Sequence, residues 1–457
     1  AELAPLSLLM KGETVPADTH WVGIPTARDR FSEEVEPEKE ETVTLATGLG
    51  RRIASIDILR GFAVLGVLLM TIRSFAGPSI GEINPPEISN EAIWNRFAYY
   101  FTHIFVDQKF MGLFSILFGA GLILMSKSLR ERGRNVLAAL SLRYFWLLLL
   151  GVAHFFLLWN GDVLAVYALC AIPLIFLLRI PTAWQFGLGM FIFLLPAVFD
   201  AGIQHSLPNL DEESRASLDE YWQPYVEDLE AEKVLHLEGS WEEQIEARWE
   251  NETEPAANRG ESLIIASLWG RFFACSLGMM LIGMALLRWK VLSAGRSLNF
   301  YRRLVWIGFG VGIPLTLYGL ETTLFHEWKW DFAIFQGRIP NHLATIPMTL
   351  GYIGLIMLWV KSKRFQLVQI WLANVGRIAL TCYLGQTALC IFIFYGVGLG
   401  LYDQFDFLEQ LGIVVLLCIV QLFFANAWLN RFRYGPLEWA WRRLSTGLVK
   451  PRPISKP

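Results

Sequence analysis

The chain contains ten strongly apolar stretches, and nearly all of its Lys and Arg clusters fall on every second connection between them. A helix needs about 20 apolar residues to cross a bilayer, so ten helices use roughly half of the chain. The stretches are long and continuous, whereas strands of a membrane barrel alternate apolar and polar residues over shorter segments. The pattern therefore predicts an all-α, polytopic transmembrane helix bundle of about ten spans.

The composition agrees with a membrane protein, since 54% of the residues are hydrophobic and the mean hydropathy is +0.40. We place the ten spans at Ile53–Phe75, Phe101–Met125, Leu137–Trp159, Val163–Ile180, Trp184–Ala201, Leu263–Trp289, Leu304–Leu324, His342–Val360, Ile378–Gly398 and Leu411–Leu429.

Short basic loops predict how the chain is oriented in the membrane. They precede the first span or follow spans two, six, eight and ten, at Arg51–Arg52, Lys127–Arg134, Lys290–Arg303, Lys361–Arg364 and Arg431–Arg443. Cytoplasmic loops of membrane proteins carry an excess of Lys and Arg, and all these loops lie on one side if the spans alternate. Both termini are therefore expected in the cytoplasm.

This topology divides the chain into five parts. They are an acidic, flexible cytoplasmic tail (1–50), the first five spans (51–201), an acidic periplasmic loop (202–262), the last five spans (263–443) and a basic cytoplasmic tail (444–457). In the periplasmic loop, Trp222, Trp241 and Trp249 indicate short amphipathic helices against the membrane or the bundle. One interpretation of the loop is an acidic, solvated spacer. The other is an element that covers a site on the outer face, as a lid or as a docking surface for a partner. The N-terminal tail is the other candidate for docking a protein partner.

Ionisable residues within the spans need an explanation, because a charge in a bilayer is costly unless it is paired or reaches water. Asp57 and Arg60 are spaced i, i+3 near the cytoplasmic end of the first span, so they share a helix face. They form either a structural ion pair or part of a site for an anionic ligand. Gly61, which follows, permits a close approach of another helix.

Two histidines are predicted beside carboxylates toward the outer side. His103 and Asp107 are spaced i, i+4 at the start of the second span. His154 near the end of the third span faces Asp162 across a tight Asn160–Gly161 turn. A histidine oriented by a carboxylate can take a proton from a hydroxyl or an amine, so both pairs are candidate catalytic residues. A histidine that only packs is the alternative.

Four arginines are candidates for binding an anion. Arg143 and Arg271 lie within spans three and six, and with Arg60 and Arg377 they are predicted to form a funnel that opens to the cytoplasm. For Arg143 and Arg377 the alternative is that each extends to the lipid headgroups.

The placement of the cysteines and the lack of known motifs argue against several kinds of site. All five cysteines lie within spans and none forms a CxxC pattern, so they are expected in the core and not in disulfides or metal sites. Zinc spacings, phosphate-binding Gly-rich loops and nucleophile elbows are absent from the sequence. We expect no metal ion and no tightly bound cofactor.

Five motifs in order resemble the YeiB-like family of bacterial inner-membrane proteins. They are Ser55–Leu69, Lys109–Gly121, the hairpin from Arg143 through His154 to Asp162, Gly376–Gln386 and Trp428–Trp439. The resemblance covers residues 51 to 443 and implies a multi-pass protein of the bacterial inner (plasma) membrane.

The family is similar in topology, and in its opening Asp-x-x-Arg-Gly, to the transmembrane acyltransferases typified by heparan-alpha-glucosaminide N-acetyltransferase. This resemblance implies transfer of an acyl group from cytoplasmic acyl-CoA to a periplasmic carbohydrate or lipid-linked acceptor, with an intramembrane His as base. By the same analogy Arg60, Arg143 and Arg271 contact the CoA phosphates, while His154 with Asp162 activates the acceptor. His103 with Asp107 is the other candidate for the base.

Two functions of other classes stay open on the sequence. A transporter or channel accounts for the buried charges and for prolines within spans, although inverted repeats are not recognisable. A non-catalytic scaffold or accessory subunit accounts for the acidic tail and loop. The expected partners are the lipid bilayer, the acceptor and a protein bound through the N-terminal tail or the loop at 202–262, but no nucleic acid.

Overall fold

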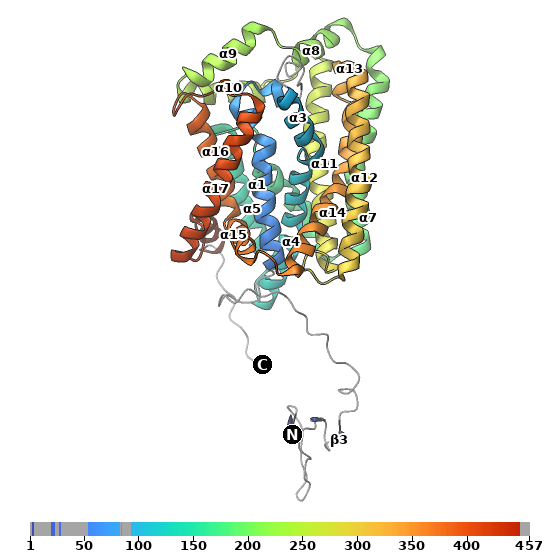
Figure 1. Ribbon diagram of the computed structural model, residues 1–457, viewed down its shortest axis with the longest axis vertical. Helices are drawn as coiled ribbons and strands as arrows, with labels where there is room; N and C mark the ends of the chain where they lie inside the picture. Colours follow the sequence, from blue (N-terminus) through green and yellow to red (C-terminus); the bar gives the residue numbers. More distant parts are fainter. Residues whose placement is uncertain are drawn as a thin grey trace, which may run out of the picture. The chain divides into compact units, whose positions relative to one another are not determined.

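The computed structural model describes residues 2–3, 20–22, 27–28, 54–82, 84 and 93–447 (Figure 1). The chain divides into two compact units, residues 1–51 and 52–457. In the first unit, strand β1 (Glu2–Leu3) pairs in parallel with β2 (His20–Val22), and β2 pairs antiparallel with β3 (Ala27–Arg28). The rest of the predicted N-terminal tail, and the tail beyond residue 447, lie outside the described residues.

The second unit is a bundle of helices, which confirms the predicted all-α membrane fold. Its α-helices are α1 (Ala54–Thr71), α2 (Arg73–Ala76), α3 (Ile93–Phe105), α4 (Lys109–Glu131), α5 (Val136–Leu157), α6 (Leu164–Phe176), α7 (Thr182–Ser206), α8 (Glu212–Trp222), α9 (Val226–Leu237), α10 (Trp241–Thr253), α11 (Arg259–Arg288), α12 (Leu298–Phe325), α13 (Trp330–Ala333), α14 (Ile339–Ser362), α15 (Gln366–Arg377), α16 (Ala379–Phe394), α17 (Phe407–Arg431) and α18 (Pro436–Gly447). Short 3₁₀ turns are η1 (Ser79–Glu82), η3 (Leu177–Arg179), η4 (Leu207–Asn209) and η5 (Gln336–Arg338).

Eight helical segments among the described residues are long and apolar enough to cross a membrane. A ninth span is made if α15 and α16, which meet at a bend of 82°, are counted together. The predicted span Val163–Ile180 is the shorter apolar segment formed by α6 and η3. The predicted span Ile378–Gly398 is the second half of the bent pair. The predicted count of about ten thus includes one short and one broken segment.

Polar caps determine where several of these helices begin. The Asp406 carboxylate accepts a hydrogen bond from the backbone N–H of Glu409 (2.9 Å), and the Glu409 carboxylate accepts one from the N–H of Asp406 (3.0 Å). Ser297 accepts one from the N–H of Phe300 at the start of α12. These contacts satisfy N–H groups that have no partner within the first helical turn.

Two glycines let α1 and α15 cross at very short distance. A Cβ atom at Gly61 would lie 2.0 Å from the carbonyl oxygen of Leu372, and one at Gly376 would lie 1.9 Å from the carbonyl oxygen of Asp57. Small residues at a crossing allow two membrane helices to bring their backbones together. The predicted role of Gly61 is confirmed, and Gly376 is its counterpart on α15.

We predict that Gly376→Ala destabilises the protein, because its methyl group forces α1 and α15 apart. Overpacking of this kind costs about 1–3 kcal/mol. The control is Gly310→Ala in α12, where an added Cβ would have no neighbour within 4 Å. Thermal unfolding of the detergent-purified proteins measures the effect. Equal unfolding temperatures for the two variants would contradict the packing argument.

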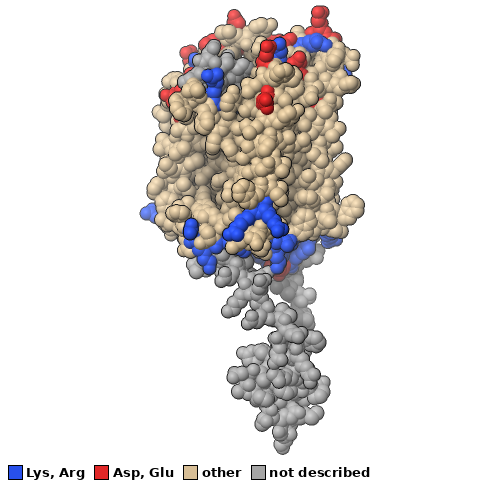
Figure 2. Space-filling model, turned by 45° about the vertical axis from the view of Figure 1, so that its right-hand side comes forward, with Lys and Arg blue, Asp and Glu red and all other residues tan. Residues whose placement is uncertain are grey.

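Charged side chains are sorted between the two ends of the helical unit. On the face shown in Figure 2, Lys and Arg gather at the lower end, whereas Asp and Glu gather at the upper end and an uncharged belt lies between them. We call the lower end the basic end; it holds the α4–α5 and α17–α18 connections, with Arg132, Arg134 and Arg433. The upper end, covered by α8–α10 and α13, is the acidic end (Figure 1).

The acidic loop folds into helices α8, α9 and α10, which dock on the ends of the spans. Trp222 at the end of α8 donates its indole N–H to the carbonyl of Trp328 (3.0 Å). Arg248 on α10 donates to the carbonyl of Phe156 (3.1 Å), which satisfies an acceptor near the C-terminal end of α5. Lys233 on α9 pairs with Asp403 (3.0 Å). The loop is therefore a packed cover over this end of the bundle.

His236 anchors α9 by its aromatic ring. The ring stacks on Tyr402 at 4.8 Å and meets the edge of Tyr395 at 4.6 Å, and Nδ1 hydrogen-bonds the carbonyl of Glu232 (2.8 Å). Burial lowers the pKa of His236 below its ordinary value, although Glu232 partly opposes this. A depressed histidine pKa means that the unfolded segment binds the proton more readily than the docked one.

We predict that α9 undocks more readily as the pH falls through and below the ordinary histidine value near 6.5. The stabilising contribution of neutral His236 is fully present above that pH and is lost below it. Hydrogen exchange of the α9 amides at several pH values measures the change. His236→Phe, which keeps the stacking and cannot be protonated, should remove this pH dependence. Identical pH profiles for the two proteins would refute the assignment.

Candidate functional site

A cavity of about 530 Å³ opens at the basic end of the bundle. Its lining comes from α1, α4, α5, α6, the α15–α16 break and α18, and includes Arg60, Arg132, Arg134, Arg143, Arg377 and Arg442 together with the single acidic residue Glu438. Its volume lies within the range of small-molecule sites in proteins. The excess of guanidinium groups suits a ligand that carries anionic groups.

Three of the four predicted anion-binding arginines line this cavity. Arg60 pairs with Asp57 at 3.2 Å and also donates to the carbonyl of Gly376. Arg143 places its guanidinium 3.4 Å from the centre of the Trp441 ring. Arg377 donates to the side chain of Asn374 (3.1 Å). Arg60 therefore pairs with Asp57 and lines the cavity at the same time, so the two predicted roles of this arginine do not exclude each other.

The fourth predicted arginine, Arg271, does not line this cavity. It is buried on α11, where it forms an ion pair with Asp200 of α7, and Ser267 donates its hydroxyl hydrogen to the same carboxylate (2.7 Å). The structure thus separates Arg271 from the funnel to which it was assigned. Because the charge is neutralised by Asp200, the pair accounts for two ionisable residues within the bundle.

Glu438 accepts hydrogen bonds from the free backbone N–H groups at the start of helix α16. One carboxylate oxygen accepts hydrogen bonds from the backbone N–H groups of Leu380 (2.8 Å) and Thr381 (3.1 Å), and the other accepts the Thr381 hydroxyl (2.6 Å). A break in a membrane helix leaves N–H groups that need another partner. The α18 carboxylate supplies that partner and, at the same time, forms part of the cavity wall.

His154 and Asp162 meet deep in the bundle. His154 Nδ1 lies 2.9 Å from Asp162 Oδ1, and the side chains are almost completely buried. Asp162 Oδ2 also accepts the backbone N–H of Ala165 at the start of α6. On the other side of the ring, His154 Nε2 lies 3.0 Å from Thr387 Oγ1 on α16. With an ionised carboxylate, which can only accept, and a neutral ring, this geometry has Nδ1 donating to Asp162 and Nε2 accepting from the threonine.

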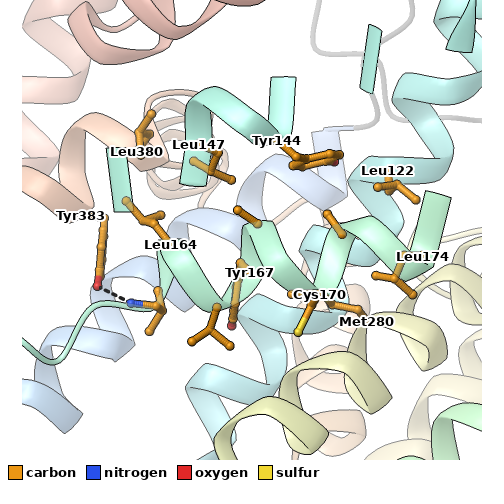
Figure 3. Close-up of a cluster of buried hydrophobic side chains, with 14 of the residues drawn as sticks. Leu122, Tyr144, Leu147, Leu164, Tyr167, Cys170, Leu174, Met280, Leu380 and Tyr383 are labelled. Carbon is orange, nitrogen blue, oxygen red and sulfur yellow. Dashed lines mark hydrogen bonds between the residues drawn. The ribbon is translucent and has the colours of Figure 1, made fainter. Parts of the chain in front are cut away.

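The inner wall of the cavity lies next to this buried cluster. Tyr383 and Tyr167 line the cavity and also a second, small pocket, whose lining includes Val163. Tyr383 accepts the backbone N–H of Val163 (3.2 Å, Figure 3), and its ring centre is 5.6 Å from that of His154. Tyr383 is therefore a residue of the cavity lining that also lies beside the histidine.

The second predicted histidine pair lies elsewhere. His103 Nδ1 is 3.3 Å from Asp107 Oδ2, and both side chains are partly exposed. His103 lies in the last turn of α3 and Asp107 in the connection to α4, where buried Lys109 donates to the carbonyl of His103 (2.7 Å) and to the side chain of Asn341. Within the described residues, no hydrogen bond or ion pair joins this pair to His154 or Asp162. The structure gives two separate sites and not one.

Sequence reasoning missed Thr387, Glu438, Tyr383 and Asp200. Asp200 carried a usable signal, because an ionisable residue at the end of an apolar span requires a partner. Tyr383 and Glu438 stand within motifs that were recognised, but nothing in their surroundings in the chain indicates a cavity. Thr387 carries no signal, since a threonine in an apolar helix is unremarkable until the residue that faces it is known.

Comparison with known proteins relates this arrangement to a family. A family model described as "Protein of unknown function (DUF418)" matches residues 286–447. The chain is 32% identical to "Uncharacterized protein YeiB" of Escherichia coli (strain K12) over 412 residues, which cover 89% of this chain and 99% of YeiB. It is 27% identical to "Uncharacterized protein YxaH" of Bacillus subtilis (strain 168) over 415 residues, covering 89% and 96% of the two chains.

A third relative, an "Uncharacterized 39.9 kDa protein in amylase 3'region" of Bacillus acidopullulyticus, is 25% identical over 399 residues and covers 87% of this chain and 94% of its own. No solved structure matches the chain. The similarity to YeiB covers 89% of this chain and 99% of YeiB, which is enough to show a common family. The chain is a multi-pass membrane protein that belongs to the YeiB-like family.

Proposed function

We propose that this protein is a bacterial inner-membrane acyltransferase, which moves an acyl group from cytoplasmic acyl-CoA to a periplasmic carbohydrate or lipid-linked acceptor. The observation that carries the proposal is the arginine-lined cavity whose inner wall lies against His154 and Asp162. By the positive-inside rule, the basic end of the bundle faces the cytoplasm. The cavity then opens on the side where acyl-CoA is available.

The mouth of the cavity suits the anionic part of acyl-CoA. Guanidinium groups form strong, charge-assisted hydrogen bonds with phosphate oxygens. Arg60, Arg143 and Arg377 stand on three different helices, α1, α5 and α15, so they surround the opening. The cavity lining also includes Leu147, Leu164 and Leu380, which belong to the hydrophobic cluster of Figure 3 and suit an apolar acyl chain.

The inner end of the cavity suits a proton transfer. Asp162 holds the His154 ring in one orientation and one tautomer, and stabilises the imidazolium that forms when Nε2 takes a proton. His154 stands on α5 three residues before its last residue, toward the acidic end. A base in this place lies between a donor from the cytoplasm and an acceptor from the periplasm.

We predict that acyl-CoA binds saturably to the detergent-purified protein, and that Arg143→Gln and Arg377→Gln each weaken this binding at least tenfold. Loss of a hydrogen bond to a charged group costs about 1.5–3 kcal/mol, and about 1.4 kcal/mol corresponds to a factor of ten. Arg303→Gln is the control, because Arg303 is an exposed arginine outside the cavity lining. Isothermal titration calorimetry with acetyl-CoA and palmitoyl-CoA measures the affinities. Absence of binding for both ligands would exclude the proposed donor.

The break between α15 and α16 supports a second candidate function, transport. Discontinuous helices often form the substrate site of transporters, with free helix ends directed at the substrate. Here the amides of the α16 end already bind Glu438, which leaves the acyltransferase as the better-supported function. Solute flux into proteoliposomes without acyl-CoA consumption would favour the transporter. Stable co-purification of a protein partner with neither activity would favour a scaffold.

A further inference from the structure

We propose that Thr387 is the nucleophile of the transfer, so that the acyl group passes through a covalent ester on its Oγ1 atom before it reaches the acceptor. This inference rests on the acyl transfer proposed above. In that proposal His154 is the base, and the structure shows what its free ring nitrogen faces. The group in contact with Nε2 is the hydroxyl of Thr387, at 3.0 Å.

Asp162, His154 and Thr387 have the arrangement of a carboxylate, a base and a nucleophile. Asp162 Oδ1 lies 2.9 Å from one ring nitrogen of His154, and Thr387 Oγ1 lies 3.0 Å from the other. Each of the three residues is at most 2% exposed. A hydroxyl is a weak nucleophile unless an adjacent base removes its proton, and such a base is normally oriented by a third group. This cluster supplies both.

The Thr387 hydroxyl is oriented differently from those of three other threonines in the spans, and unlike the distant contacts of Thr349 and Thr381 its partner is a histidine. Thr71, Thr316 and Thr323 each donate to the carbonyl oxygen four residues earlier in their own helix, at 3.3, 3.0 and 2.8 Å. This local contact is the usual way to satisfy a hydroxyl in a membrane helix. The Thr387 hydroxyl instead contacts a histidine 233 residues away in the chain.

The position of Thr387 on α16 connects it with the proposed donor site. Tyr383 lies one turn earlier on the same face, about 6 Å along the helix axis, and it forms the inner wall of the cavity. In this proposal, movement of the Tyr383 side chain lets the acyl end of the donor reach the Thr387 hydroxyl one turn further along α16.

A covalent intermediate also removes a geometric difficulty of transfer across a membrane. The donor enters from the basic end and the acceptor from the acidic end, where α10 covers the end of α5. A direct transfer requires both to reach the reacting carbon at once. With an ester on Thr387, each substrate needs to reach only the same buried atom in turn.

The two steps balance in atoms and electrons. In the first, the Thr387 Oγ1 electron pair attacks the thioester carbonyl carbon while its proton moves to His154 Nε2; the C–S bond breaks and the CoA thiolate takes that proton. In the second, a hydroxyl or amine of the acceptor attacks the ester carbon and gives its proton to His154. The C–O bond to Thr387 breaks, and the proton returns to Oγ1. No oxidant or reductant takes part.

The test is covalent labelling of the detergent-purified full chain by [¹⁴C]acetyl-CoA and [¹⁴C]palmitoyl-CoA in the absence of acceptor. We expect label in the wild type, released by hydroxylamine and located by mass spectrometry in the peptide that holds Thr387. Thr387→Val, nearly the same shape without the hydroxyl, should lose the label. Thr387→Ser should keep it. His154→Gln should reduce labelling at least a hundredfold, because the hydroxyl has lost its base.

Thr316→Val is the matched control, since it removes a buried hydroxyl of a different span and should leave labelling unchanged. Unfolding temperatures of all variants show whether a loss of label reflects a loss of fold. If Thr387→Val is folded and transfers acyl groups normally, Thr387 is only a structural contact and the inference is overturned, while the acyltransferase proposal stands. If the wild type binds acyl-CoA without being labelled, the inference fails in the same way. If it does not bind acyl-CoA, both proposals fail.

Discussion

The structure depends on one constraint: inside a bilayer, every polar group must find its partner within the protein. Arg271 pairs with Asp200, His154 contacts Asp162 and Thr387, and the open end of α16 binds Glu438. These partners lie on α7, in the α5–α6 connection, on α16 and on α18. These contacts therefore tie helices together, and they also bring unlike chemical groups to within hydrogen-bonding distance.

The same constraint explains why the candidate site is where it is. A helix can be interrupted within the bundle only if its free N–H groups are satisfied, and Glu438 allows α15 to end and α16 to start at a bend of 82°. The interruption places Gly376 against α1 and Arg377 on the cavity wall. It also directs α16 so that Thr387 faces His154. One local break thus shapes the cavity and the cluster behind it.

The two ends of the bundle carry different parts of the proposed reaction. Guanidinium groups line an opening at the basic end, while helices α8 to α10 cover the acidic end. Between them, Tyr383 both lines the cavity and lies beside His154. In the proposed reaction this places the donor site next to the base without an open channel through the bundle.

Sequence reasoning placed the pairs that are close in the chain. Asp57–Arg60 and His103–Asp107 follow from the helical repeat, and His154–Asp162 follows from a hairpin with a tight turn. It assigned Arg271 to the wrong group of arginines, because the spacing of residues along a span says nothing about which helix lies opposite. Asp200, 71 residues away in the chain, decides where that guanidinium belongs.

The sequence by itself determined the membrane fold, the sorting of charge between its ends and the local pairs of ionisable residues. These features depend on apolar length and on contacts within one helix or one turn, which are readable from composition and spacing. Only the tertiary structure decided that three arginines share a cavity, that Glu438 completes α16 and that Thr387 meets His154. Those contacts depend on the order and rotation of packed helices, which are set by packing across the whole bundle.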